Sequence, residues 1–111
     1  MANPWSGEVA LVVNGERRVL KLTLGALAEL EAALEEDTLV ALVARFEEGR
    51  FSARDVLALL VAGLRGGGWS GSAEDLVSAE IEGGLVGAAR AAGQLLVRAF
   101  EVPGDADDGQ V

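Results

Sequence analysis

The first part of the chain contains short runs rich in valine and leucine, a composition typical of β-strands. Two such runs, residues 8–13 and 16–22, flank Asn14-Gly15, which favours a two-residue type I′ turn and therefore a β-hairpin over residues 8–22. With that turn Val13 pairs with Glu16, and five large apolar residues of the two runs share one face: Val9, Leu11, Val13, Leu20 and Leu22. An isolated hairpin is only marginally stable, so helices or another chain must cover this face.

From residue 23 onward the apolar residues recur every three or four positions, which predicts about five α-helices. We expect them at about residues 24–36, 38–48, 53–65, 73–82 and 85–100. Polar residues that cap helix N-termini precede four of them: Thr23, Asp37, Ser52 (with Asp55) and Ser72 (with Asp75). The expected fold is therefore α+β and mainly α, with an N-terminal β-hairpin followed by about five helices in a compact bundle.

Apolar stripes mark the faces of the first and last helices that we expect to be buried. The first stripe is Leu24, Leu27, Leu30 and Leu34, and the last is Leu85, Ala88, Ala89, Ala92, Leu95, Leu96 and Ala99. A chain of 111 residues, half of them hydrophobic, can build one core, so we expect a single globular domain over residues 1–102. Residues 103–111 begin with Pro103 and contain three aspartates, which predicts an acidic disordered tail.

The chain contains no cysteine and no histidine. This excludes disulfides, thiolate nucleophiles, Cys/His zinc sites and Ser–His catalysis. The acidic run that includes Glu29, Glu31 and Glu35 lies off the leucine stripe, which predicts a solvated face rather than a catalytic carboxylate pair. We therefore predict no enzymatic activity, no cofactor and no metal site.

Charge narrows the choice of partner. A formal net charge of -9 argues against a nucleic acid and against an anionic membrane surface. No apolar run approaches the roughly 20 residues that span a bilayer, and residues 1–7 lack the features of a signal peptide. We therefore expect a cytoplasmic protein whose partner is another protein.

Residues 66–71, with the sequence GGGWSG, formally match the glycine pattern of a dinucleotide-binding loop. A helix rather than a strand is expected before them, so a flexible linker between helices is the favoured interpretation. Trp69 is the one large side chain in this linker. It either anchors the loop to the core or serves as a partner-binding anchor, since tryptophan is enriched at interaction hot spots.

The order of these segments is similar to that of a known family. Residues 7–31 read GEVALVVNGERRVLKLTLGALAELE, a hairpin running directly into a Thr-capped helix, and RFEEGRFSARDVL (45–57) and GLRGGG (63–68) follow. This resembles a family of small tail proteins encoded in gene transfer agents and tailed-phage-like elements of alphaproteobacteria. That family is described both as a tail tube protein and as a tail assembly chaperone. The resemblance covers about residues 7–100 and implies no catalytic motif.

The two family roles differ in what they require. A tube subunit forms rings through sheets that extend between neighbours, whereas a chaperone must shield a long helical tape-measure protein until the tube polymerises around it. One hairpin and five helices favour the chaperone, acting in the bacterial cytoplasm, with the tape-measure protein as main client and the tail tube protein as a second. A structural tail component retained in the particle is the alternative, and a homo-oligomer is left open.

We expect the partner-binding surface at the hairpin's outer edge and at the apolar seam between the first and third helices. Leu27, Leu60 and Trp69 are the candidate partner-binding residues.

Overall fold

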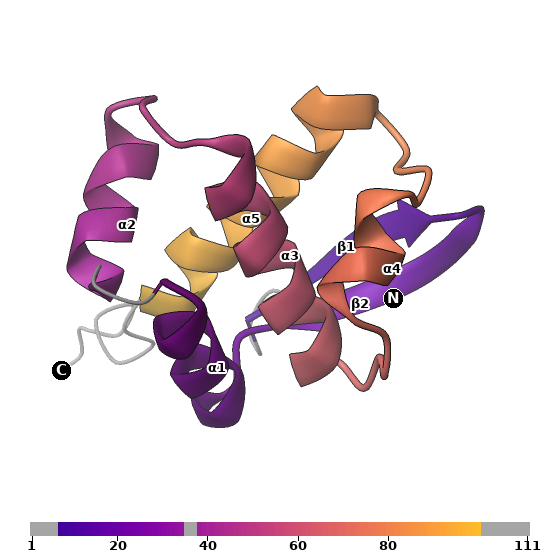
Figure 1. The fold of residues 1–111 in the computed structure, drawn as a ribbon, viewed down its shortest axis with the longest axis horizontal. Helices are drawn as coiled ribbons and strands as arrows, with labels where there is room; N and C mark the ends of the chain where they lie inside the picture. The colour runs from indigo at the N-terminus through magenta and orange to yellow at the C-terminus, as the bar shows by residue number, and fades with distance from the viewer. Residues whose placement is uncertain (1–6, 35–37, 101–111) are drawn as a thin grey trace, which may run out of the picture.

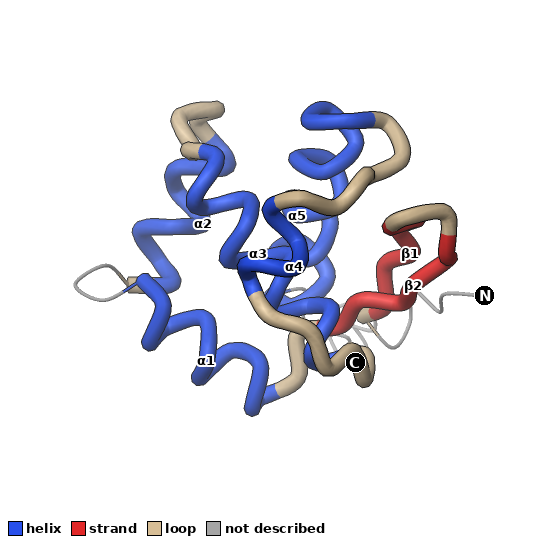
Figure 2. Tube along the Cα trace, turned by 45° about the vertical axis from the view of Figure 1, so that its right-hand side comes forward, coloured by secondary structure: helices blue, strands red, loops and turns tan. Residues whose placement is uncertain are grey.

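The computed structural model describes residues 7–34 and 38–100, in which a β-hairpin is followed by five helices (Figure 1). The elements are β1 (Glu8–Val13), β2 (Glu16–Lys21), α1 (Leu24–Leu34), α2 (Leu39–Glu47), α3 (Ala53–Gly66), α4 (Ala73–Val77) and α5 (Gly84–Phe100). Figure 2 shows the hairpin at one side of the molecule and the helices grouped beside it. This confirms the mainly helical α+β fold expected from the sequence.

The hairpin has the register that the sequence predicts. Val13 lies opposite Glu16 and Val9 lies opposite Leu20. Asn14 and Gly15 have φ angles of 52° and 78°, the left-handed conformation that both central positions of a type I′ turn require. All five residues of the predicted apolar face are buried: Val9, Leu11, Val13, Leu20 and Leu22.

A segment after α4 pairs with the tip of the hairpin, a contact that sequence analysis did not predict. The backbone N–H of Asn14 donates to the Glu80 carbonyl at 2.7 Å, and that of Glu82 donates to the Val12 carbonyl at 3.0 Å. The Asn14 side chain also accepts from the Glu80 N–H at 2.8 Å. The helix expected over residues 73–82 therefore ends at Val77, because these backbone groups bond to the hairpin instead of continuing the helix.

The helix α3 lies at the centre of the core, in contact with β2, α1 and α5. Its residues Leu59, Leu60 and Leu64 are almost completely buried. A Cβ at Gly63 would lie 2.6 Å from Cδ1 of Leu95, so glycine at this position lets α5 approach α3 closely. Figure 1 shows α5 passing behind α3.

The end of α3 packs directly against the backbone of β2. A Cβ at Gly66 would collide with the carbonyl oxygen of Lys21, and one at Gly67 would collide with that of Val19. In the observed register these two carbonyls point away from β1. The expectation of a flexible linker is therefore wrong at its first two glycines, which close the outer edge of β2 by tight packing.

Three helix starts are capped by side chains, although one cap differs from the prediction. The backbone N–H of Ala26 donates to Thr23 Oγ1 at 3.1 Å, as expected. For α2 the cap is Thr38, whose Oγ1 accepts from the Ala41 N–H at 3.0 Å. The predicted cap, Asp37, lies outside the described residues, as do residues 35–36 and the acidic segment 103–111. Ser52 and Asp55 form the predicted capping box of α3.

Two leucines predicted for buried stripes lie on the surface. Leu24 is 85% exposed and Leu85 is 72% exposed. Each stands in the first turn of its helix, before the point where that helix reaches the core. The other residues of the last stripe are buried or pack against the core.

Candidate partner-binding groove

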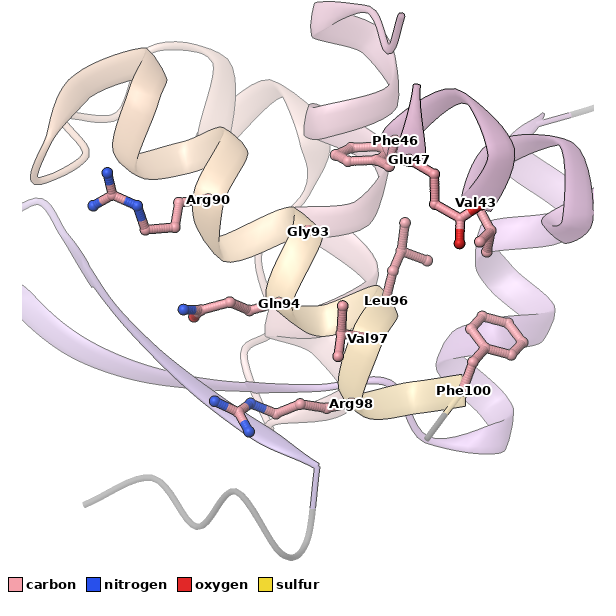
Figure 3. A pocket seen from close by; sticks show the side chains of 10 residues that line it. All are labelled: Val43, Phe46, Glu47, Arg90, Gly93, Gln94, Leu96, Val97, Arg98 and Phe100. Atoms are coloured by element: carbon pink, nitrogen blue, oxygen red, sulfur yellow. The ribbon is translucent and has the colours of Figure 1, made fainter. Parts of the chain in front are cut away.

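An open groove of about 640 Å³ lies between α2 and α5 (Figure 3). Val43 and Phe46 of α2 and Leu96, Val97 and Phe100 of α5 form its apolar part. Val97 is 64% exposed and Phe100 is 48% exposed, although both side chains are large and hydrophobic. Contiguous exposed apolar side chains of this kind mark interaction surfaces, and a groove between helices suits an amphipathic helix.

The groove has a basic flank. Arg90, Gln94 and Arg98 follow one another at four-residue spacing along α5, and Figure 3 shows their side chains on the side away from Phe46. In the described part of the chain neither arginine has an ion pair, and the Nε atom of Arg98 is buried without a hydrogen-bond partner. Glu47 belongs to the opposite wall. The groove therefore combines an apolar floor with an unneutralised positive side.

Three contacts position α2, the helix that forms the opposite wall. Leu42 is its one fully buried side chain. Arg45 donates through two guanidinium nitrogens to the two carboxylate oxygens of Asp55 on α3, at 2.9 Å each. Phe46 stacks on Phe51, with ring centroids 4.4 Å apart and an interplanar angle of 9°. The width of the groove thus depends on a side-chain ion pair and an aromatic stack as well as on core packing.

Asp55 is the one buried charged residue among those described. Burial raises the pKa of its carboxyl group, but hydrogen bonds from Arg45 and from the backbone N–H of Ser52, together with the charge of Arg45, lower it by more. The net result is a pKa below the ordinary value of 3.8. Asp55 is therefore ionised at neutral pH, and its bond to Arg45 is charge-assisted.

Leu27 and Leu60, two of the predicted partner-binding residues, do not lie in this groove. Leu60 is 1% exposed and is a core residue, so in this structure it is not on an accessible surface. Leu27 is partly buried and packs against the core. The seam between α1 and α3 does contain a shallow cavity of about 290 Å³, but it is lined by residues such as Ala58 and Val61.

Trp69, the third candidate, is partly buried after the end of α3. Its backbone N–H donates to the Leu64 carbonyl at 2.9 Å. A Cβ at Gly71 would collide with the indole, so the ring lies directly over that glycine. The side chain borders two shallow cavities of about 420 and 340 Å³. A partner-binding role for Trp69 remains a prediction.

The sequence contains a second apolar stripe on α5 that corresponds to the groove. Residues 86, 90, 93, 97 and 100 of α5 alternate in steps of four and three, and all except Arg90 are apolar or glycine. This stripe is distinct from the buried stripe of the same helix. A helix with apolar residues on two faces needs a second surface to cover the outer face.

Within residues 7–34 and 38–100, no three acidic side chains come close enough together to hold a metal ion. Over the same residues, no helix has both the length and the apolar character needed to span a bilayer.

Fold and groove together define a small α+β domain with a predominantly apolar surface groove between two helices. Residues 6–102 match the model of the family described as "Phage tail tube protein, GTA-gp10", and the chain belongs to that family. This confirms the resemblance to gene transfer agent tail proteins and makes the chain a phage-type tail protein from a structural family. No curated protein and no solved structure gives a significant match.

Proposed function

We propose that this protein is a tail assembly chaperone and that its α2–α5 groove binds a helical segment of the tape-measure protein. The observation that supports this most is the exposed apolar surface formed by Val97, Phe100 and their neighbours between two helices. Such a surface suits a client that is long, helical and unprotected until the tube surrounds it. The tail tube protein is a second candidate client.

The dimensions and charge of the domain agree with this role. Between Arg90 and Phe100 α5 is about 15 Å long, at 1.5 Å per residue, which allows contact over about three turns of a bound helix. The net charge of -9 would keep a complex with an apolar client in solution.

A structural tail component retained in the particle is the second candidate, and the family description favours it. A tube wall built from sheets that continue between neighbours needs free strand edges. In the described residues the sheet has two six-residue strands, and Gly66 and Gly67 pack against the outer edge of β2. The tip of β1 is bonded to residues 80–82. The outer edge of β2 and the tip of β1 are therefore not available for pairing with a neighbour, which supports the chaperone role over a tube wall whose sheet continues from both edges.

Co-expression of the tagged chain with the tape-measure protein of the same gene cluster tests the proposal. We expect the client to become soluble and to co-purify. Val97→Asp should abolish this capture, because a bound helix would desolvate the new carboxylate against apolar atoms. The matched control is Val77→Asp on α4, a valine that is 68% exposed and does not line the groove. The control should capture the client as the wild type does.

Circular dichroism of both variants confirms that they are folded, as expected for substitutions at exposed positions. A client that stays insoluble and unbound beside the wild-type chain contradicts the chaperone function. Capture that survives Val97→Asp shows that the client binds at another surface.

A further inference from the structure

The basic flank gives the groove a chemical preference. We infer that the groove selects amphipathic helices whose apolar stripe is bordered by carboxylates that meet Arg90 and Arg98. This inference rests on the proposed function of the groove and adds to it the charge pattern of the bound helix.

Acidic residues outnumber basic ones in this chain by 18 to 9. An arginine therefore has many carboxylates available, and four arginines have ion pairs at 2.7–3.0 Å: Arg18, Arg45, Arg50 and Arg65. Within the described residues Arg17, Arg54, Arg90 and Arg98 have none, and of these four only Arg90 and Arg98 line the groove. Their charges are thus left for a group that does not belong to the described part of the chain.

Arg98 adds a second argument. Its Nε atom is buried and makes no hydrogen bond, an unfavourable state for a charged donor. The buried Nε atom is closed to an outside group, so a partner carboxylate would pair with the terminal guanidinium nitrogens of Arg98 and offset the cost of burying this charge. Burial of the groove by an uncharged helix would instead desolvate Arg98 further without compensation.

The spacing defines the pattern that a partner helix needs. Arg90 and Arg98 are eight residues apart, or about 12 Å along α5 at 1.5 Å per residue. A helix lying alongside α5 meets both with carboxylates seven or eight positions apart on one flank of its apolar stripe. Glu47 on the opposite wall disfavours carboxylates on the other flank.

Two synthetic peptides test the inference. Both are 18-residue amphipathic helices with the same leucine stripe, and they differ in carrying either glutamates or lysines on one flank. The net charge of -9 would by itself favour the lysine peptide. We expect the glutamate peptide to bind about tenfold more tightly in fluorescence anisotropy at physiological salt, as two partly exposed ion pairs would provide. Equal binding, or tighter binding of the lysine peptide, overturns the inference.

Charge-reversal variants locate the preference. Arg90→Glu with Arg98→Glu should reverse it in favour of the lysine peptide. The matched control is Arg17→Glu with Arg54→Glu, which changes the net charge equally at two exposed arginines outside the groove, neither of which has an ion pair in the described part. The control pair should keep the preference. If both pairs have the same effect, overall charge rather than the groove determines binding, and the inference fails.

Other occupants of the groove would also contradict it. A second copy would appear as a dimer in sedimentation that Arg98→Glu dissociates. The chain's own residues 103–111 would block both peptides until they are deleted. A preference for the glutamate peptide without capture of the tape-measure protein would refute the proposed function alone, and capture without the preference would refute only this inference.

Discussion

The bond between Arg45 and Asp55 is one of the three contacts that position α2, one wall of the groove. Asp55 is 7% exposed and accepts three hydrogen bonds of 2.9 Å, two from Arg45 and one from the backbone N–H of Ser52. Asp55→Ala removes all three acceptor contacts. It also leaves the Arg45 side chain, 23% exposed, without this carboxylate.

The loss of unfolding free energy expected for Asp55→Ala follows from these contacts. Loss of the capping interaction costs about 1 kcal/mol. Loss of the charged pair adds about 1–2 kcal/mol, at the lower end for buried pairs because Arg45 can still reach water. The sum, about 2–3 kcal/mol, corresponds to a decrease in Tm of about 10 °C for a domain of this size.

Urea unfolding followed by circular dichroism measures this loss. The control is Asp75→Ala, because Asp75 holds the same position in the cap of α4 but is exposed and, among described residues, has no ion pair. It should cost less than about 1 kcal/mol. In an Arg45→Met background, Asp55→Ala should cost only the capping term, about 1 kcal/mol. Equal losses of unfolding free energy for Asp55→Ala and Asp75→Ala would refute this reasoning. So would a cost of Asp55→Ala that is the same in the Arg45→Met background as in the wild type.

Three further predictions concern pH, packing and the core. Burial raises the pKa of Asp55 but the hydrogen bonds it accepts lower it below 3.8, so its ionised form contributes stability above that unfolded value and loses it as the pH falls through the folded pKa. The difference in unfolding free energy between wild type and Asp55→Asn should therefore be largest at pH 6 and disappear as the pH falls into the acid range. A difference that does not change with pH would contradict the lowered pKa of Asp55. Gly67→Ala should destabilise the domain by more than about 2 kcal/mol because its Cβ meets the Val19 carbonyl. Gly25→Ala, whose Cβ would only make an ordinary contact of 3.9 Å with Thr23 Oγ1, should be neutral or stabilising by up to about 1 kcal/mol in thermal melts. Leu60→Asp should unfold the protein, since burying an unpaired charge costs several kcal/mol, and a native circular dichroism spectrum would show that this position is not core.

Features that depend on neighbouring residues were predictable from the sequence. The turn at Asn14-Gly15 determines the hairpin register, because two residues with positive φ leave little choice of turn. The Thr23 cap and the Ser52–Asp55 capping box join residues three positions apart, so they too are visible as local patterns.

Features that join distant segments were not predictable. The bond between Asn14 and Glu80 spans 66 residues, and no local pattern indicates that residues 80–82 would pair with the hairpin rather than extend α4. The contacts of Gly66 and Gly67 with β2 likewise exist only in the folded chain. Together they cover the outer edge of β2 and the tip of β1.

The groove itself was missed for a related reason. Sequence periodicity identified the inner stripe of α5, and the expected binding seam was placed between α1 and α3. The position of α2 depends on Arg45 and Asp55, which belong to different helices and are ten residues apart. Only the second, outer stripe of α5, with Val97 and Phe100, pointed to the surface that the structure leaves open.

A chaperone acts on its client during assembly and is not part of the finished tail. Absolute quantification of the chain by mass spectrometry, in cell lysate and in purified particles, tests this role most directly. We expect the chain to be abundant in lysate, in complex with the tape-measure protein, and absent from purified particles. A chain present in purified particles in numbers comparable to a tube subunit would contradict the chaperone role and establish the structural role.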